Sequence, residues 1–130
     1  MTTVLLDTHV VHWWSAEPAK LSRPATQAIE SARELAVSAI TWYELAWLAK
    51  QERIVLAAPI RSWLEEIARD VRTATVTPAI ADAAVALPTT FPGDPADRLI
   101  YATAIEQGWQ LITKDRRLRE HRHPRAVTLW

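Results

Sequence analysis

The stretch TTVLLDTHV, residues 2–10, decides how this chain folds. Its first five residues form a short, mostly apolar run that is typical of a buried parallel strand, and Asp7 ends that run where a helix can begin. The stretch WQLITKDRRL, residues 109–118, repeats this arrangement with a run that ends near Asp115. Since the functional crevice of an open α/β sheet lies at the carboxyl ends of its strands, we expect both carboxylates at one edge of the sheet.

Strand and helix patterns alternate along the rest of the chain. Short apolar or alternating runs predict further strands over residues 35–39, 73–77, 110–113 and 126–130. Caps and apolar periodicity predict helices that begin at about Ser22, Pro78 and Asp94, and helices over residues 7–14, 40–51, 60–69 and 115–120. Prolines and a glycine within residues 88–95 predict a loop. The alternation favours an α/β fold, a parallel sheet with helices on both faces.

Length and composition narrow the class of protein. A chain of 130 residues suits a single domain over residues 1–130, and 49% hydrophobic with 23% charged residues is a globular composition. No apolar run reaches the ~18 residues of a membrane span, and the N-terminus lacks the basic start of a secretory signal. The absence of cysteine excludes disulfides and thiolate sites and fits a cytoplasmic protein.

The formal net charge of zero hides a basic segment. Residues 114–125 hold six basic side chains against two acidic ones. Such a run is more often a solvated surface, but its place directly beside Asp115 is compatible with contact to a phosphate backbone.

Two further acidic residues stand in unusual surroundings. Asp97 lies in GDPADRLIYATA, residues 93–104, and Glu44 lies among apolar neighbours in ITWYELAWL, residues 40–48. A lone buried carboxylate costs several kcal/mol unless it is paired or bound to a cation. No Lys or Arg stands three or four residues from Glu44, so it either pairs across the fold with an arginine such as Arg98 or joins an acidic pocket, which we favour.

Each aspartate also has a plainer interpretation. Asp7, Asp94, Asp97 and Asp115 all sit at predicted helix starts, where Asp is a preferred cap or first-turn residue. Four carboxylates gathered in one pocket would, however, repel one another, and Mg²⁺ or Mn²⁺ relieves such repulsion with oxygen ligands. We therefore predict a metal site on Asp7, Glu44, Asp97 and Asp115. The nearby pair His9 and His12 lacks a third ligand and is interpreted as structural.

The motifs LLDTHV, ITWYEL, DPADRLIYATA and LITKD, in this order, resemble the PIN domain, and most of all the VapC-type toxins of bacterial toxin–antitoxin pairs. The resemblance covers essentially the whole chain. It implies a Rossmann-like sheet of about five parallel strands and a metal-dependent ribonuclease. It places the family's catalytic roles on the same four acids, with Asp94 and Thr113 in support. It also implies a homodimer and a small antitoxin whose tail covers the pocket.

The expected function is an endoribonuclease that cuts single-stranded or loop RNA. Asp7 and Asp97 would hold the metal most directly, and Arg98, Lys114 or Arg116 would steady the scissile phosphate.

Two alternatives belong to other classes. One is an aspartate-nucleophile phosphatase, whose DxD pattern this chain breaks at His9. The other is a module of the same fold that binds RNA or protein without cutting. No nucleotide-cradling glycine motif is present.

Overall fold

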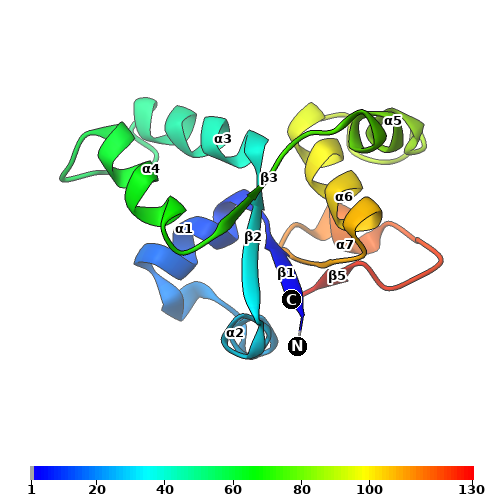
Figure 1. Ribbon diagram of the computed structural model, residues 1–130, viewed down its shortest axis with the longest axis horizontal. Coiled ribbons are helices and arrows are strands. Elements are labelled where there is room, and N and C mark those ends of the chain that lie inside the picture. Colours follow the sequence, from blue (N-terminus) through cyan, green and yellow to red (C-terminus); the bar gives the residue numbers. More distant parts are fainter. Residues whose placement is uncertain (1) are drawn as a thin grey trace.

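A five-stranded sheet forms the centre of the molecule. The computed structural model describes residues 2–130 (Figure 1), and residue 1 of the predicted domain lies outside the described residues. The strands are β1 (Thr3–Leu6), β2 (Glu34–Ser38), β3 (Arg72–Ala74), β4 (Gln110–Ile112) and β5 (Thr128–Leu129). Their order is β3-β2-β1-β4-β5, and every pairing is parallel. The predicted parallel α/β sheet is thus confirmed.

Helices cover both faces of this sheet. They are α1 (Thr8–Ala16), α2 (Arg23–Ser31), α3 (Ala39–Lys50), α4 (Ile60–Ala68), α5 (Pro78–Ala86), α6 (Pro95–Gln107) and α7 (Arg116–Glu120). Figure 1 shows α1, α3 and α4 on one side and α5, α6 and α7 on the other. A short 3₁₀ turn at Pro18–Lys20, which the sequence analysis did not predict, follows α1.

Alternation along β1 builds the two halves of the core. Val4 and Leu6 belong to a cluster with residues of α1, α2, α3 and α4, whereas Leu5 belongs to a cluster with residues of α6 and α7. Successive side chains of a strand point to opposite faces, so a single apolar run serves both layers. A central strand that is buried on both faces explains why the run is almost continuously apolar.

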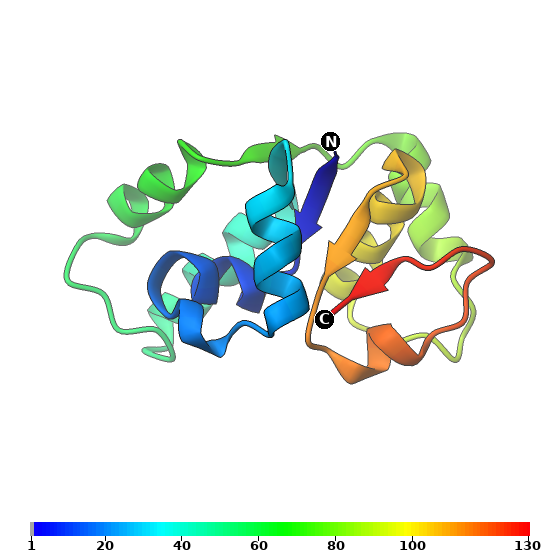
Figure 2. The same ribbon diagram turned by 90° about the horizontal axis from the view of Figure 1, so that it is seen from below.

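The strand order creates a crevice beside β1. From β1 the chain adds β2 and β3 on one side and then returns to add β4 and β5 on the other. Figure 2 shows β1 (blue), β4 (orange) and β5 (red) next to one another. Ligands of open α/β sheets bind at such a switch point, outside the carboxyl ends of the strands. The residues that directly follow β1 and β4 therefore occupy the crevice.

Two strands, β3 and β5, are shorter than the sequence predicts by two residues or more. The strand expected over residues 73–77 is limited to Arg72–Ala74, because its partner β2 ends at Ser38, which pairs with Ala74 and caps α3. The strand expected over residues 126–130 is limited to Thr128–Leu129, where it pairs with the short β4. No helix among residues 2–130 is both long and apolar enough to cross a membrane.

Candidate active site

Asp7 lies in the crevice as both a helix cap and a buried acid. Asp7 directly follows β1 and is buried, with 4% of the residue exposed. Oδ1 accepts a hydrogen bond from the backbone N–H of Thr8 at 2.8 Å, which caps α1. Oδ2 accepts from the hydroxyl of Thr113 at 2.6 Å. β1 and β4 are neighbours, so Asp7 can cap α1 and also lie in the pocket beside Thr113, which follows β4.

Glu44 reaches the same crevice from α3. Its Oε1 accepts a hydrogen bond from the hydroxyl of Thr8, whose oxygen also lies 3.2 Å from that of Thr41. Burial raises the pKa of Glu44, the Thr8 hydrogen bond opposes that rise, and the charges of Asp7 and Asp94 add to it. Glu44 therefore lies near other acids, which is the arrangement that we favoured for a carboxylate in apolar surroundings.

The pKa of Asp97 is raised by its burial and by the acids around it. Asp97 lies in the first turn of α6, and its side chain is 15% exposed. Burial, followed by the negative charges of Asp7, Asp94, Asp115 and Glu44, raises its pKa from 3.8 to about 7. A carboxyl resists ionisation among like charges, so the four other acids lie near enough to affect the ionisation of Asp97.

Asp115 differs because it has a basic partner. It caps α7 by accepting from the backbone N–H of Arg117 at 2.9 Å, and Nη2 of Arg117 lies 3.2 Å from its Oδ2. Burial acts to raise the pKa of Asp115, but the hydrogen bonds and charge of Arg117 outweigh it and hold the pKa below its usual value. The same Nη2 lies 3.5 Å from Oδ2 of Asp97. Arg117 thus bridges two acids of the pocket.

The supporting residues named above have clear contacts. Asp94 caps α6 and accepts from the backbone N–H groups of Ala96 at 2.8 Å and Asp97 at 3.1 Å. The Thr113 hydroxyl, besides donating to Asp7, accepts from the backbone N–H of Asp115 at 3.0 Å. Asp94 therefore fixes the backbone of Asp97, and the hydroxyl of Thr113 links Asp7 to Asp115.

Arg98 does not have the role that the sequence suggested. Its guanidinium donates to five backbone carbonyl oxygens at 3.0–3.3 Å, those of Ala84, Leu87, Pro88, Phe91 and Pro92. An arginine has five N–H donors, so this set uses all of them. Arg98 therefore does not pair with Glu44, which was the alternative we did not favour, and it has no donor left for the phosphate contact that we expected. Arg98 holds the loop between α5 and α6.

The other predicted phosphate contacts are also engaged elsewhere. Arg116 pairs with Glu120 at 2.6 Å, and Lys114 lies over the ring of Trp13 at 5.5 Å. Arg117, which the sequence patterns did not single out, is the arginine that contacts Asp97 and Asp115. Arg117 stands two residues after the aspartate that caps α7, and this spacing lets its side chain reach back to the capping carboxylate. That spacing is visible in the sequence and could have identified Arg117.

The donor set of the pocket suits a hard divalent cation. Among residues 2–130, no three His, Asp or Glu side chains converge tightly enough to enclose an ion directly. Mg²⁺ does not need such a cage, because it keeps several waters and binds through one or two carboxylates. Five acids lie in this pocket, and Arg117 contacts only Asp97 and Asp115, so the pocket favours a cation. The residues therefore fit Mg²⁺ or Mn²⁺ held partly through water.

Comparisons with known proteins show what this chain is similar to. The PIN domain family matches residues 4–124. Over all 130 residues, the chain is 71% identical to Ribonuclease VapC22 of Mycobacterium tuberculosis and covers all of that protein. It resembles a toxin–antitoxin complex from Klebsiella pneumoniae (TM-score 0.63, 26% identity, 86% of each chain covered). It also resembles DNA-bound VapBC from Salmonella typhimurium (TM-score 0.73, 18% identity, 99% of this chain and 98% of that one).

Proposed function

This chain belongs to the PIN-domain family, and from that premise we propose that it is a Mg²⁺- or Mn²⁺-dependent endoribonuclease, the toxin of a toxin–antitoxin pair. The observation that carries the proposal is the gathering of Asp7, Glu44, Asp94 and Asp115 around Asp97, whose pKa is raised by burial and by their charges. An acid cluster of this kind at the switch point of a parallel sheet is suited to metal-assisted attack on a phosphodiester.

The acids would divide the work between holding and orienting the ion. Asp7 and Asp97 would hold it most directly, and Glu44 and Asp115 would orient its waters. When bound, the ion supplies a water of lowered pKa and stabilises charge on the phosphate. The hydroxyls of Thr8 and Thr113 fix the carboxylates of Glu44 and Asp7 by donating to them. Such outer hydrogen bonds keep ligands in the geometry that binding needs.

Arg117 is the proposed contact for the scissile phosphate. It lies beside Asp97 and Asp115, and its side chain is 66% exposed, so an approaching phosphate can reach it. A guanidinium binds phosphate oxygens in a bidentate manner and offsets the negative charge of the acids around it.

We further propose a cognate antitoxin and a homodimer as partners, and the cytoplasm as the place of action. The Klebsiella pneumoniae structure that the chain resembles is a toxin–antitoxin complex. Tyr43 and Trp47 are 65% and 51% exposed on α3, next to Glu44, and with Pro95 they line one hollow beside the pocket. Large exposed aromatic side chains beside a catalytic pocket support a protein that covers it.

Cleavage of a cellular RNA pool tests the proposal. Purified protein, verified free of antitoxin, would be incubated with Mg²⁺, Mn²⁺ or EDTA, beside Asp7→Asn and Asp97→Asn. We expect discrete cuts that need the metal and that both variants lose while remaining folded. A folded wild-type protein that binds the RNA without cutting it under any condition would instead identify a binding module. Trapping of a phosphoaspartate would revive the phosphatase.

A further inference from the structure

A second hollow adjoins the acid pocket on the side of α1 and is open to solvent. Its volume is about 360 Å³, within the range of small-ligand sites. Two of its lining residues come from α1 and two from the segment between β4 and α7: His9, Trp13, Lys114 and Asp115. We call it the Trp13 hollow.

Two of these residues place the Trp13 hollow directly beside the acids. Asp115 lines the hollow and also acts on the ionisation of Asp97 in the acid pocket. Nδ1 of His9 lies 3.6 Å from Oδ2 of Asp7. A strand of RNA whose scissile phosphate lies at the acids can therefore bring an adjoining nucleotide to the hollow.

The chemistry of the hollow suits such a nucleotide. Trp13 is partly exposed, and Nζ of the exposed Lys114 lies 5.5 Å from the centre of its ring. Proteins hold single strands by stacking bases on aromatic rings and by placing basic groups along the backbone. A cation over an exposed ring is held weakly. A nucleobase can therefore replace the ammonium over Trp13 and leave Lys114 for the phosphate.

The walls of the hollow are fixed before any ligand binds. Nε2 of His9 accepts a hydrogen bond from the backbone N–H of Lys114 at 3.1 Å, which ties α1 to the segment after β4. The ring of His9 lies one helical turn from Trp13, at 5.0 Å, and the ring of Trp130 lies 5.9 Å from Trp13. Rings held in this way do not have to be ordered on binding, which removes one cost of association.

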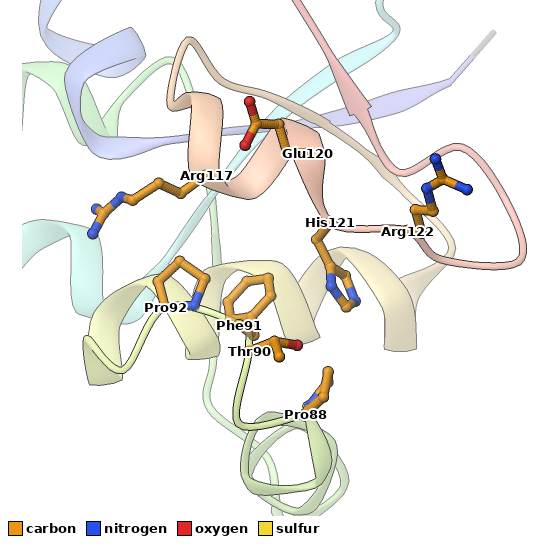
Figure 3. Close-up of a pocket in the computed structure, with 8 residues that line it drawn as sticks. All are labelled: Pro88, Thr90, Phe91, Pro92, Arg117, Glu120, His121 and Arg122. Atoms are coloured by element: carbon orange, nitrogen blue, oxygen red, sulfur yellow. The ribbon is translucent and has the colours of Figure 1, made fainter.

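A third hollow, between α7 and the loop that precedes α6, does not offer this chemistry (Figure 3). Arg117 and Arg122 belong to its lining, but Figure 3 shows both side chains directed away from its interior. Arg117 instead contacts Asp97 and Asp115. Since Arg117 is the proposed contact for the scissile phosphate, the Trp13 hollow is left for the adjoining nucleotide.

We propose that the Trp13 hollow binds a nucleotide of single-stranded RNA next to the scissile bond, with its base stacked on Trp13 and its phosphate at Lys114. The inference rests on the proposed function for its substrate class. Neither residue touches the scissile phosphate in this arrangement, so both act in binding the strand and not in breaking the bond.

RNA binding without cleavage tests the hollow. The probe is a fluorescent single-stranded RNA of roughly ten nucleotides and mixed sequence, titrated in EDTA at several salt concentrations. We expect Trp13→Ala to weaken binding roughly five-fold or more at an unchanged salt slope, because stacking releases no counterions. Lys114→Ala should reduce the salt slope by about 0.7, as the loss of one phosphate contact on a single strand does.

Each variant has a matched control in the chain. Lys20→Ala removes the other ammonium near the Trp13 ring, at 6.0 Å, but Lys20 pairs with Glu17 and does not line the hollow. Trp47→Ala removes an exposed tryptophan of α3 instead. Both controls should bind RNA as the wild type does. Trp13→Phe keeps an aromatic ring and should recover most of the binding, which separates lost stacking from a lost fold.

Several results would overturn the hollow as a nucleotide site. They are equal weakening by Trp13→Ala and Trp47→Ala, equal salt slopes of Lys114→Ala and Lys20→Ala, no recovery in a folded Trp13→Phe, and a wild type that does not bind the RNA. The test also separates this inference from the proposed function. A wild type that cuts RNA while Trp13→Ala binds it normally keeps the ribonuclease and refutes the hollow. Binding through Trp13 and Lys114 without any cutting refutes the ribonuclease and keeps the hollow.

Discussion

Asp97 is the residue whose ionisation most affects the fold and the site together. Its pKa in the folded, metal-free protein is about 7 against an ordinary value of 3.8. Between those values the folded state binds more protons than the unfolded state, so the stability that this group contributes falls as the pH rises from about 4 to 7. The ionised carboxylate above pH 7 thus costs stability, up to a ceiling of about 4 kcal/mol.

Replacing Asp97 with Asn should therefore stabilise the metal-free protein at alkaline pH. We expect the melting temperature in EDTA to exceed that of wild type at pH 8, with a gain that shrinks steadily towards pH 4. Thermal unfolding followed by circular dichroism across this pH range provides the measurement. A variant that melts below wild type at pH 8 would show that Asp97 is stabilised as an anion by contacts that outweigh its neighbours.

Arg117 should affect metal binding and catalysis in opposite directions. It partly neutralises Asp97 and Asp115, at 3.5 and 3.2 Å. Arg117→Ala removes a positive charge beside the ion, so Mn²⁺ should bind a few-fold more tightly by calorimetry, while cleavage should slow by roughly tenfold or more because the phosphate contact is lost. Arg119→Ala is the control. Weaker Mn²⁺ binding by Arg117→Ala would mean that the arginine organises the ligands.

At the scale of elements, the connection between α5 and α6 depends on one side chain. Arg98 sits in the first turn of α6 and satisfies carbonyl oxygens at the end of α5 and through the loop. A segment with prolines at positions 88, 92 and 95 has few backbone donors of its own, so a long arginine supplies them.

Arg98→Ala should consequently destabilise the protein by roughly 2–4 kcal/mol, since several carbonyl oxygens lose a charged donor at once. Arg98→Lys should recover little, because an ammonium cannot reproduce the planar fork. Urea denaturation of both variants beside Arg119→Ala gives the comparison. A loss no larger than that of the control would mean that water replaces the guanidinium without cost.

Elements were predicted more accurately than their ends. Ser22 caps α2, and Gly108, at a φ of 69°, ends α6, because caps and left-handed glycines act within a few residues and are visible in sequence. The end of β3 was not visible, since it depends on where β2 stops. Arg98 was misassigned for the same kind of reason: its partners are backbone carbonyls, which carry no sequence signal.

At the scale of the whole molecule, the pocket is assembled from four separate parts of the chain. Asp7 follows β1, Glu44 lies on α3, Asp97 on α6 and Asp115 at the start of α7. A cation that binds these acids binds only the folded protein, so its binding energy adds to the stability of the whole fold.

Mg²⁺ should therefore raise the melting temperature, and more strongly at pH 8 than at pH 5.5. Protonated Asp97 must release its proton before it serves as a ligand, so apparent affinity rises with pH up to about 7. Melting curves measured at both pH values, with Mg²⁺ at roughly 5 to 20 times its Kd, make the comparison. The Asp97→Asn variant should lose most of this pH dependence. An equal shift at both pH values would place the ion away from Asp97.

The sequence by itself determined the parallel α/β architecture and the helix starts, because strand alternation, capping and apolar patterning operate over a few neighbouring residues. Tertiary structure decided which charges meet. The contact of Thr8 with Glu44, the commitment of Arg98 to a loop and the bridge from Arg117 to Asp97 all join residues from different elements. Burial and Coulomb interactions depend on distance in space, so the raised pKa of Asp97 exists only once the sheet has brought its neighbours together.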